Sequence, residues 1–309
     1  MSAEGAIELC GVPLAGPLLN GSGTFDAIAA RRAFGDALLE QFPFHCYVSK
    51  TITVKPRAGN PPPRLWEVPG GLINSIGLPN KGVDGFLSED LPLLAELPVP
   101  LCVSVMGFSP DELAVLVERA SDCDEIELIE LNVSCPNVET GLVMGADAGE
   151  TGAAVSRLRP LTGKPLIVKL TPNATEPAVV AEAAVAAGAD AVSLINTLRG
   201  MALSPRTRQP WLGGRTGGVS GAAVRAVALA QVFSVAARVE VPVIGMGGIA
   251  TGADAADFLA AGATAIAVGT ESFRDPAAGL RIGAELAGIR AATAAEEPAH
   301  AASGRRAPA

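Results

Sequence analysis

A cysteine flanked by two asparagines is the clearest chemical feature of this sequence. The run Leu131-Asn132-Val133-Ser134-Cys135-Pro136-Asn137 continues an apolar stretch that begins at Ile126. Pro136 should end the strand, so Cys135 is expected on the loop that follows it. A thiol beside side chains that both donate and accept hydrogen bonds suits acid–base chemistry on a polar ring. The alternative is a half-buried structural cysteine, since free cysteine often behaves as a small hydrophobic residue.

Two lysines stand at or near the ends of apolar runs. Lys50 follows residues 47–49, and Lys169 lies near the end of the run at 166–170. An unpaired buried ammonium is costly, so each lysine needs a carboxylate partner or a bound ligand. A neighbouring carboxylate is the simpler explanation for one lysine, but two lysines in one site favour an anionic or electron-rich ligand. Reduced flavin, which carries negative charge near N1, is such a ligand.

Glycine turns follow the last two expected strands. They are Gly247-Gly248 and Gly269-Thr270. Glycine lets the backbone approach a ligand closely, and helix N-termini present N–H donors to anions. Either pair alone can be explained as a tight turn, but the two together on adjacent strands predict a phosphate site. The segment Asn74 to Asn80 is, taken alone, a polar turn, because Asn, Gly and Pro all favour turns.

Short apolar runs alternate with longer helical patterns, which predicts a closed parallel barrel. The expected strands span 18–21, 47–53, 101–106, 126–133, 166–170, 191–196, 241–245 and 265–268. The expected helices span 26–34, 85–97, 110–121, 149–158, 176–187, 221–237, 253–261 and 277–289. We therefore predict an α/β fold, a single-domain (β/α)8 TIM barrel over residues 1–290, followed by a mobile C-terminal tail over residues 291–309.

Two long insertions follow the second and sixth expected strands, at residues 54–84 and 198–219. Loops after barrel strands form the functional face, so we expect both insertions to cover a ligand. The residues expected at that face include lysines, amides, hydroxyls and a thiol, but no histidine or carboxylate. His45 and His300 are the only histidines, and neither ends an expected strand. This argues against a Ser-His-Asp hydrolase and a metal-dependent hydrolase, and we expect no metal.

Composition and charge exclude other classes of function. The 309-residue chain is 49% hydrophobic with a net charge of -9, which leaves no basic stripe for nucleic acid. The apolar helical stretch at 226–237 is shorter than the ~20 residues of a membrane span. Residues 1–7 lack a basic segment followed by an apolar one, so we expect no signal peptide. Five cysteines without a C-x-x-C pair indicate a reducing cytoplasm and no local zinc or iron–sulfur site.

Taken together, these segments resemble class 1 dihydroorotate dehydrogenase over about residues 18–273. The most specific matches are Asn74-Ser75-Ile76-Gly77-Leu78-Pro79-Asn80 and Asn132-Val133-Ser134-Cys135-Pro136-Asn137. Supporting matches are Ser49-Lys50-Thr51, Asn196-Thr197 followed by Gly200-Met201, Gly217-Gly218-Val219-Ser220-Gly221, Gly247-Gly248-Ile249 and Gly269-Thr270. The resemblance implies an FMN-binding barrel that oxidises (S)-dihydroorotate to orotate in de novo pyrimidine biosynthesis.

The resemblance also implies a role for each matched residue. Cys135 would be the base that removes the C5 proton of dihydroorotate while hydride leaves C6 for flavin N5, and Lys50 would lie between substrate and flavin. A cysteine at this position, rather than a serine, is typical of class 1. The implied substrate contacts are Lys50, Asn74, Ser75, Ile76, Gly77, Leu78, Asn132, Asn137, Asn196 and Thr197. The implied FMN contacts are Ser22, Lys50, Thr51, Ser104, Asn132, Lys169, Ile195, Gly221, Gly247, Gly248, Gly269 and Thr270.

Within that FMN set, Lys169 would face the N1 side of the flavin, and Gly247, Gly248, Gly269 and Thr270 would hold the phosphate. The chain departs from the family in two places. Ser104 stands where an Asn often ends the third strand, and Ala202-Leu203-Ser204 stands where an Asp often follows the Gly-Met pair.

Residues 196–201 and 135–138 resemble the NAD-linked 1B branch of the family. That resemblance implies a homodimeric core joined to separate electron-transfer subunits, each carrying FAD and a [2Fe-2S] cluster, in a heterotetramer. This chain itself has no motif for either of those cofactors. Two alternatives stay open at this point. One is a dihydropyrimidine or dihydrouridine reductase, which also uses a cysteine near a flavin. The other is a non-flavin phosphate-binding barrel, a lyase or isomerase with Lys169 as a Schiff base.

Overall fold

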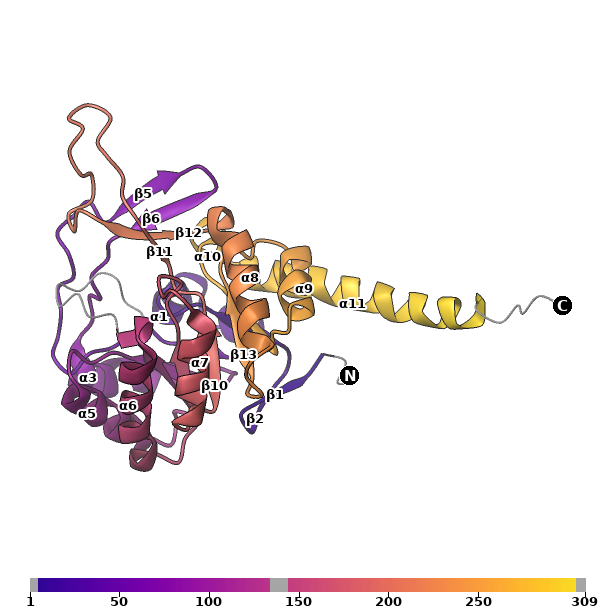
Figure 1. Ribbon diagram of the computed structural model, residues 1–309, viewed down its shortest axis with the longest axis horizontal. Coiled ribbons are helices and arrows are strands. Elements are labelled where there is room, and N and C mark those ends of the chain that lie inside the picture. Colours follow the sequence, from indigo (N-terminus) through magenta and orange to yellow (C-terminus); the bar gives the residue numbers. More distant parts are fainter. Residues whose placement is uncertain (1–4, 134–143, 304–309) are drawn as a thin grey trace.

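A parallel eight-stranded barrel forms the centre of the computed structural model, which describes residues 5–133 and 144–303 (Figure 1). In spatial order its strands are β3 (Leu18–Asn20), β14 (Ala265–Val268), β13 (Val243–Met246), β10 (Ala191–Leu194), β9 (Leu166–Lys169), β8 (Leu128–Asn132), β7 (Leu101–Val105) and β4 (Tyr47–Val48). A parallel bridge between Leu19 and Cys46 and a 2.7 Å hydrogen bond from His45 N to Leu18 O join the two ends of this sheet. The structure therefore confirms the predicted barrel and all eight predicted strands.

Helices surround the barrel in the predicted alternation. They are α1 (Ala27–Phe34), α2 (Ala37–Glu40), α3 (Gly82–Gly85), α4 (Leu91–Leu94), α5 (Pro110–Ser121), α6 (Ala148–Leu158), α7 (Pro177–Ala186), α8 (Arg225–Ala236), α9 (Gly252–Ala260), α10 (Glu271–Arg274) and α11 (Ala278–Ser303), with a π-helix at Phe86–Asp90 between α3 and α4. Local sequence sets several helix starts. Ser109 caps α5 by accepting from Glu112 N, and Thr251 forms a capping box with Asp254 at the start of α9.

The last helix is longer than the sequence pattern predicted. We expected it to end at residue 289 and a tail to begin at 291, but α11 continues to Ser303 and projects away from the barrel (Figure 1). Its distal part, residues 291–303, is rich in alanine, the residue with the highest helix propensity. No helix within the described ranges is both long and apolar enough to cross a bilayer.

An N-terminal hairpin closes the amino end of the barrel. Its strands are β1 (Ile7–Leu9) and β2 (Val12–Leu14), and they pair antiparallel. Leu9 and Leu14 are buried and pack with inward-facing barrel residues such as Leu19 and Leu128. The next residue of β8, Ile129, points outward and packs in the larger core under the helices, because side chains alternate along a strand. The barrel is thus sealed at this end, which leaves the carboxyl end of the strands for a ligand.

The two long insertions meet over that carboxyl end in a second, antiparallel sheet, which we call the roof sheet (Figure 1). Its strands, in order, are β11 (Leu198–Gly200), β12 (Gly217–Ser220), β6 (Gly71–Asn74) and β5 (Leu65–Val68). Asn74 on β6 pairs with Gly218 on β12, so this pairing fixes the position of one insertion relative to the other. A small core steadies the sheet, with the rings of Trp66 and Trp211 4.6 Å apart.

Candidate active site

A cavity of about 270 Å³ lies between the carboxyl ends of the barrel strands and the roof sheet. That volume is near the lower end of small-molecule sites, ~300 Å³. Many of the residues predicted from the sequence to bind substrate or cofactor line it. They are Ser22, Lys50, Thr51, Asn74, Ile76, Gly77, Leu78, Asn132, Lys169, Ile195, Asn196, Thr197, Gly221, Gly247, Gly248, Gly269 and Thr270. The fold therefore brings segments from most of the chain to one place.

The remaining predicted residues fall into two groups. Ser75 and Ser104 are fully buried and lie behind the cavity wall rather than in it. Ser75 Oγ accepts a 2.9 Å hydrogen bond from Asn60 Nδ2, and Ser104 Oγ lies 2.9 Å from Thr51 Oγ1. Ser104 thus contacts the cavity-lining Thr51, whereas Ser75 contacts Asn60, which does not line the cavity. Cys135 and Asn137 lie outside the described residues, so their roles stay predictions.

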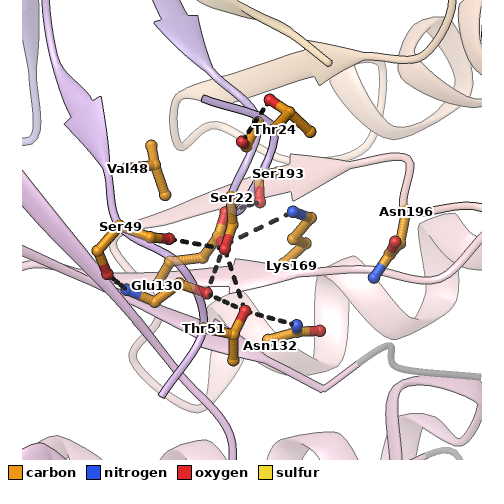
Figure 2. Close-up of polar contacts among 12 residues, drawn as sticks. Ser22, Thr24, Val48, Ser49, Thr51, Glu130, Asn132, Lys169, Ser193 and Asn196 are labelled. Atoms are coloured by element: carbon orange, nitrogen blue, oxygen red, sulfur yellow. Dashed lines mark hydrogen bonds and ion pairs between the residues drawn. The ribbon is translucent and has the colours of Figure 1, made fainter. Parts of the chain in front are cut away.

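Hydroxyl groups form a chain along one wall of the cavity (Figure 2). Ser22 Oγ donates to Ser49 O at 2.8 Å and lies 3.0 Å from Thr51 Oγ1. Thr51 in turn accepts from Asn132 Nδ2 at 3.1 Å. Asn132 ends β8 and is 6% exposed, so the strand carries its amide to the cavity floor and Thr51 orients it. This wall offers both donors and acceptors to a polar ring.

A carboxylate lies under the cavity, one layer below the strand ends that the sequence analysis considered. Glu130 Oε1 lies 3.7 Å from Lys169 Nζ, and the two side chains are only 4% and 7% exposed. Glu130 precedes Asn132 by two positions, so both side chains point to the same side of β8. A charged residue inside an apolar strand run was the signal that sequence reasoning missed. For Lys169, the simpler explanation of a lysine paired with a carboxylate applies, although Lys169 also lines the cavity.

One side of the cavity has backbone but few side chains. Gly221, Gly247 and Gly248 line it with φ angles of 94°, 127° and 84°, a region that favours glycine. A Cβ atom on Gly248 would lie 2.8 Å from Gly221 O. Thr270 adds a hydroxyl that donates to Ser220 Oγ at 2.8 Å. Turns of this kind admit a phosphate close to backbone N–H groups.

The roof sheet and its flanks supply the other wall. Asn74 Nδ2 donates to Gly218 O at 3.2 Å, and Asn196 Oδ1 accepts from Thr197 N at 2.8 Å. Gly77 and Leu78 follow with φ angles of 75° and 57°. The left-handed conformation costs Leu78 roughly 1–2 kcal/mol, and strain of this kind is concentrated at ligand sites. The cavity is thus lined by amides above and a cationic side chain below, which suits a polar, anionic ring.

The four cysteines that the structure describes do not line the cavity. Burial raises the pKa of the Cys10 thiol to about 11 and raises the pKa values of Cys46 and Cys102 as well. The thiolate is the reactive form of cysteine, so these three thiols, which stay protonated near neutral pH, cannot readily act as bases or nucleophiles. Cys123 follows the C-terminal end of α5, and its Sγ donates to Arg119 O. Of the five cysteines in the sequence, Cys135 lies outside the described residues, so its assignment to this site stays a prediction.

Comparisons with known proteins agree with this geometry. The family model described as dihydroorotate dehydrogenase matches residues 5–289. The chain is 44% identical to the catalytic subunit of dihydroorotate dehydrogenase B (NAD(+)) from Pelobacter propionicus, over 91% of this chain and 92% of that protein. It is 46% identical to the subunit of the same name from Geotalea uraniireducens, over 90% of each chain.

A solved structure also resembles the chain. It is DHODH from Eimeria tenella, in complex with ferulenol, with a TM-score of 0.77 and 22% sequence identity. The superposition covers 93% of this chain and 85% of the other. At this level of identity the likeness supports the barrel fold alone.

Proposed function

The chain belongs to the dihydroorotate dehydrogenase family, and we propose on that basis that it oxidises (S)-dihydroorotate to orotate in de novo pyrimidine biosynthesis. One observation carries the proposal from family to activity. Residues that the resemblance assigned to substrate and cofactor, drawn from positions 22 to 270, surround a single cavity. Function depends on the site rather than on the barrel fold, and a barrel that catalyses a different reaction is not expected to bring this set of amides, hydroxyls and lysines together.

We propose FMN as the cofactor, because the residues present fit it. Gly247, Gly248, Gly269 and Thr270 would hold the phosphate, because the positive φ angles of Gly247 and Gly248 leave room for it, and Gly221 would line the flavin. Ser22, Thr51 and Ile195 would line the ring, and Lys169 would favour negative charge on it. When bound, FMN supplies the acceptor for the hydride that leaves C6 of dihydroorotate.

The amide side chains would bind the substrate ring. Dihydroorotate is a cyclic ureide with alternating donors and acceptors, which Asn74, Asn132 and Asn196 can match. The ammonium group of Lys50 would compensate the negative charge of the substrate carboxylate. The roof sheet would cover the cavity and exclude water. Cys135 is proposed as the base that takes the C5 proton. A thiol has an ordinary pKa of ~8.5, so the rate of substrate oxidation should rise with pH as Cys135 ionises.

The names of the relatives, which specify a catalytic subunit of an NAD(+)-linked enzyme, support a partner protein. We propose a separate subunit that carries FAD and a [2Fe-2S] cluster and accepts electrons from this chain. The proposed homodimeric core and heterotetramer rest on the resemblance to the 1B branch. A cytoplasmic location is proposed too. It is supported by Cys10, Cys46, Cys102 and Cys123, which are free thiols as expected in a reducing compartment.

The test is anaerobic addition of dihydroorotate to the purified, FMN-reconstituted protein while flavin absorbance is recorded. We expect bleaching in the parent protein and bleaching at least ~100-fold slower in Cys135→Ala, since a general base contributes ~10²–10⁴-fold. Cys123→Ala, at a thiol away from the cavity, is the matched control and should bleach at the parent rate.

Each contrary outcome has a distinct meaning. Protein that stays colourless with added FMN would contradict a flavin enzyme and favour a lyase or isomerase. Bleaching by dihydrouracil but not by dihydroorotate would favour a dihydropyrimidine-type reductase. Unchanged bleaching in Cys135→Ala would remove Cys135 from the mechanism while leaving the activity intact.

A further inference from the structure

A polar layer crosses one half of the barrel interior just below the cavity. Ser104, Glu130, Lys169 and Ser193 lie on β7, β8, β9 and β10, which are consecutive neighbours in the sheet. Ser104 is the register partner of Glu130, and Lys169 is the partner of Ser193. Two residues earlier on each of these strands the interior is apolar, with Cys102, Leu128, Ile167 and Ala191. The polar groups are thus confined to the level directly beneath the cavity.

Glu130 is the centre of this layer (Figure 2). Its Oε1 accepts a 2.9 Å hydrogen bond from Ser104 Oγ, and its Oε2 accepts a 3.1 Å hydrogen bond from Ser193 Oγ. With 3% of the residue exposed, almost no water reaches this carboxylate. Leaving an ionised group in such a place without a counter-charge is strongly destabilising. The two serines therefore orient the carboxylate, and Lys169 supplies the opposite charge.

The geometry of the ion pair leaves Lys169 available to a ligand. Its Nζ lies 3.7 Å from Glu130 Oε1, which is too long for a hydrogen bond. The ammonium group therefore compensates the carboxylate charge without donating a hydrogen bond to that oxygen. Lys169 also lines the cavity, whereas Glu130 does not. A ligand in the cavity thus meets the lysine first, with the glutamate charge behind it.

Resting on the proposed function, we propose that Glu130 is a positioning residue that offsets the charge of Lys169 and thereby sets the reduction potential of the bound flavin. The physical reason is the charge of the reduced ring, which is negative near N1. With Glu130 ionised, the Glu130–Lys169 pair is neutral and gives the reduced ring limited stabilisation. Without that carboxylate, the Lys169 cation beside the ring would have no counter-charge. The negative charge of the reduced ring would then compensate this cation, which favours reduction.

The test is the two-electron midpoint potential of the FMN-loaded protein in three variants. Glu130→Gln keeps the side-chain shape and removes the negative charge, so its potential should rise. Lys169→Met removes the cation and leaves the carboxylate, so its potential should fall. The double variant restores neutrality and should lie between the two. We expect each single shift to be at least tenfold in the reduction equilibrium constant, about 30 mV for a two-electron couple.

Glu182→Gln is the matched control. Glu182 lies on α7, is ion-paired with Arg238 at 2.7 Å and is exposed at the surface. The same substitution there should leave the potential at the parent value. Ser104→Ala removes one hydrogen bond from Glu130 but no charge, so its shift should be smaller than that of Glu130→Gln.

Opposite shifts in the two single variants would support the proposal, because a merely structural residue would not give a signed pattern. An unchanged or lower potential in Glu130→Gln would overturn it. If Glu130→Gln does not fold, Lys169→Met decides alone, since a potential that does not fall contradicts the offset. Failure of the proposed function is distinguishable, because the parent protein would then either bind no FMN or keep its flavin absorbance when dihydroorotate is added.

Discussion

Replacing Gly23 with alanine should displace the Lys50 side chain without removing any polar group from the cavity. Gly23 follows β3 and has a φ of 73°. An added Cβ atom would lie 2.7 Å from Lys50 Cδ and 2.8 Å from Lys50 Nζ. Ordinary contact begins at 3.4 Å, so the Lys50 side chain would have to retreat by about 0.7 Å. Because Lys50 is flexible, it can move, and the fold should survive.

The size of both effects follows from this geometry. A left-handed alanine costs roughly 1–2 kcal/mol, and a more restricted unfolded chain returns ~0.4–1 kcal/mol. The net loss in unfolding free energy should be about 1 kcal/mol, which lowers Tm by roughly 2 °C. A misplacement approaching 1 Å in a positioned group can cost ~100-fold in rate. We therefore expect kcat/KM for dihydroorotate to fall at least ~10-fold.

Gly35 provides the matched control for backbone strain. It ends α1 with a φ of 64°, and a Cβ atom there would meet nothing within 4 Å. Its ψ of -151° places Gly35 in a region that is essentially restricted to glycine, so Gly35→Ala should lose at least as much stability as Gly23→Ala and still keep the parent kcat/KM. Thermal unfolding measures the first quantity, and anaerobic flavin reduction by dihydroorotate measures the second. If both variants keep parent kinetics, the placement of Lys50 does not matter to the reaction and the reasoning is refuted.

Two other residues give separate tests. Gly248→Ala should weaken FMN binding to the apoprotein ~10-fold or more in a fluorescence titration, because its Cβ would lie 2.8 Å from Gly221 O at the proposed phosphate turn. Gly262→Ala, with a φ of 102° and only the Ala236 methyl nearby, should bind FMN normally. Burial lowers the pKa of His45 below 6.5, so the unfolded chain takes up its proton first and stability should decline as pH falls below 6.5. Tm should fall less steeply with acid in His45→Asn, and equal slopes would contradict this assignment.

The barrel was predictable because its strands are covered on both faces. Runs such as 265–268 are apolar throughout, and a helical pattern separates each strand from the next, so the number and order of the strands were predictable. The glycine turns at Gly247-Gly248 and Gly269-Thr270 were predictable for a related reason. Their position after the last two strands determines which end of the barrel they occupy.

Other features depend on contacts that the sequence does not encode locally. The roof sheet pairs Asn74 with Gly218, far apart in the chain, and its strands are too short to carry a clear alternating pattern. The three-residue strands of the N-terminal hairpin were missed for the same reason. Glu130 was overlooked because only the strand ends were searched, although its side chain lies one layer below them. The role of Cys135 stays a prediction.

The shared register of the roof sheet constrains how the two insertions can diverge. Strand side chains alternate between faces, so deleting one residue just before β6 would turn Asn74 away from the cavity and Ile73 toward it. The loop between β11 and β12 projects outward (Figure 1), and its exposed residues 205–209 can change in number without disturbing the core around Trp211. The segments that tie β6 and β12 to the barrel have no such freedom. Homologues should therefore vary in length at the tip of the second insertion. At its base, any change in length should be accompanied by a compensating change in the first insertion.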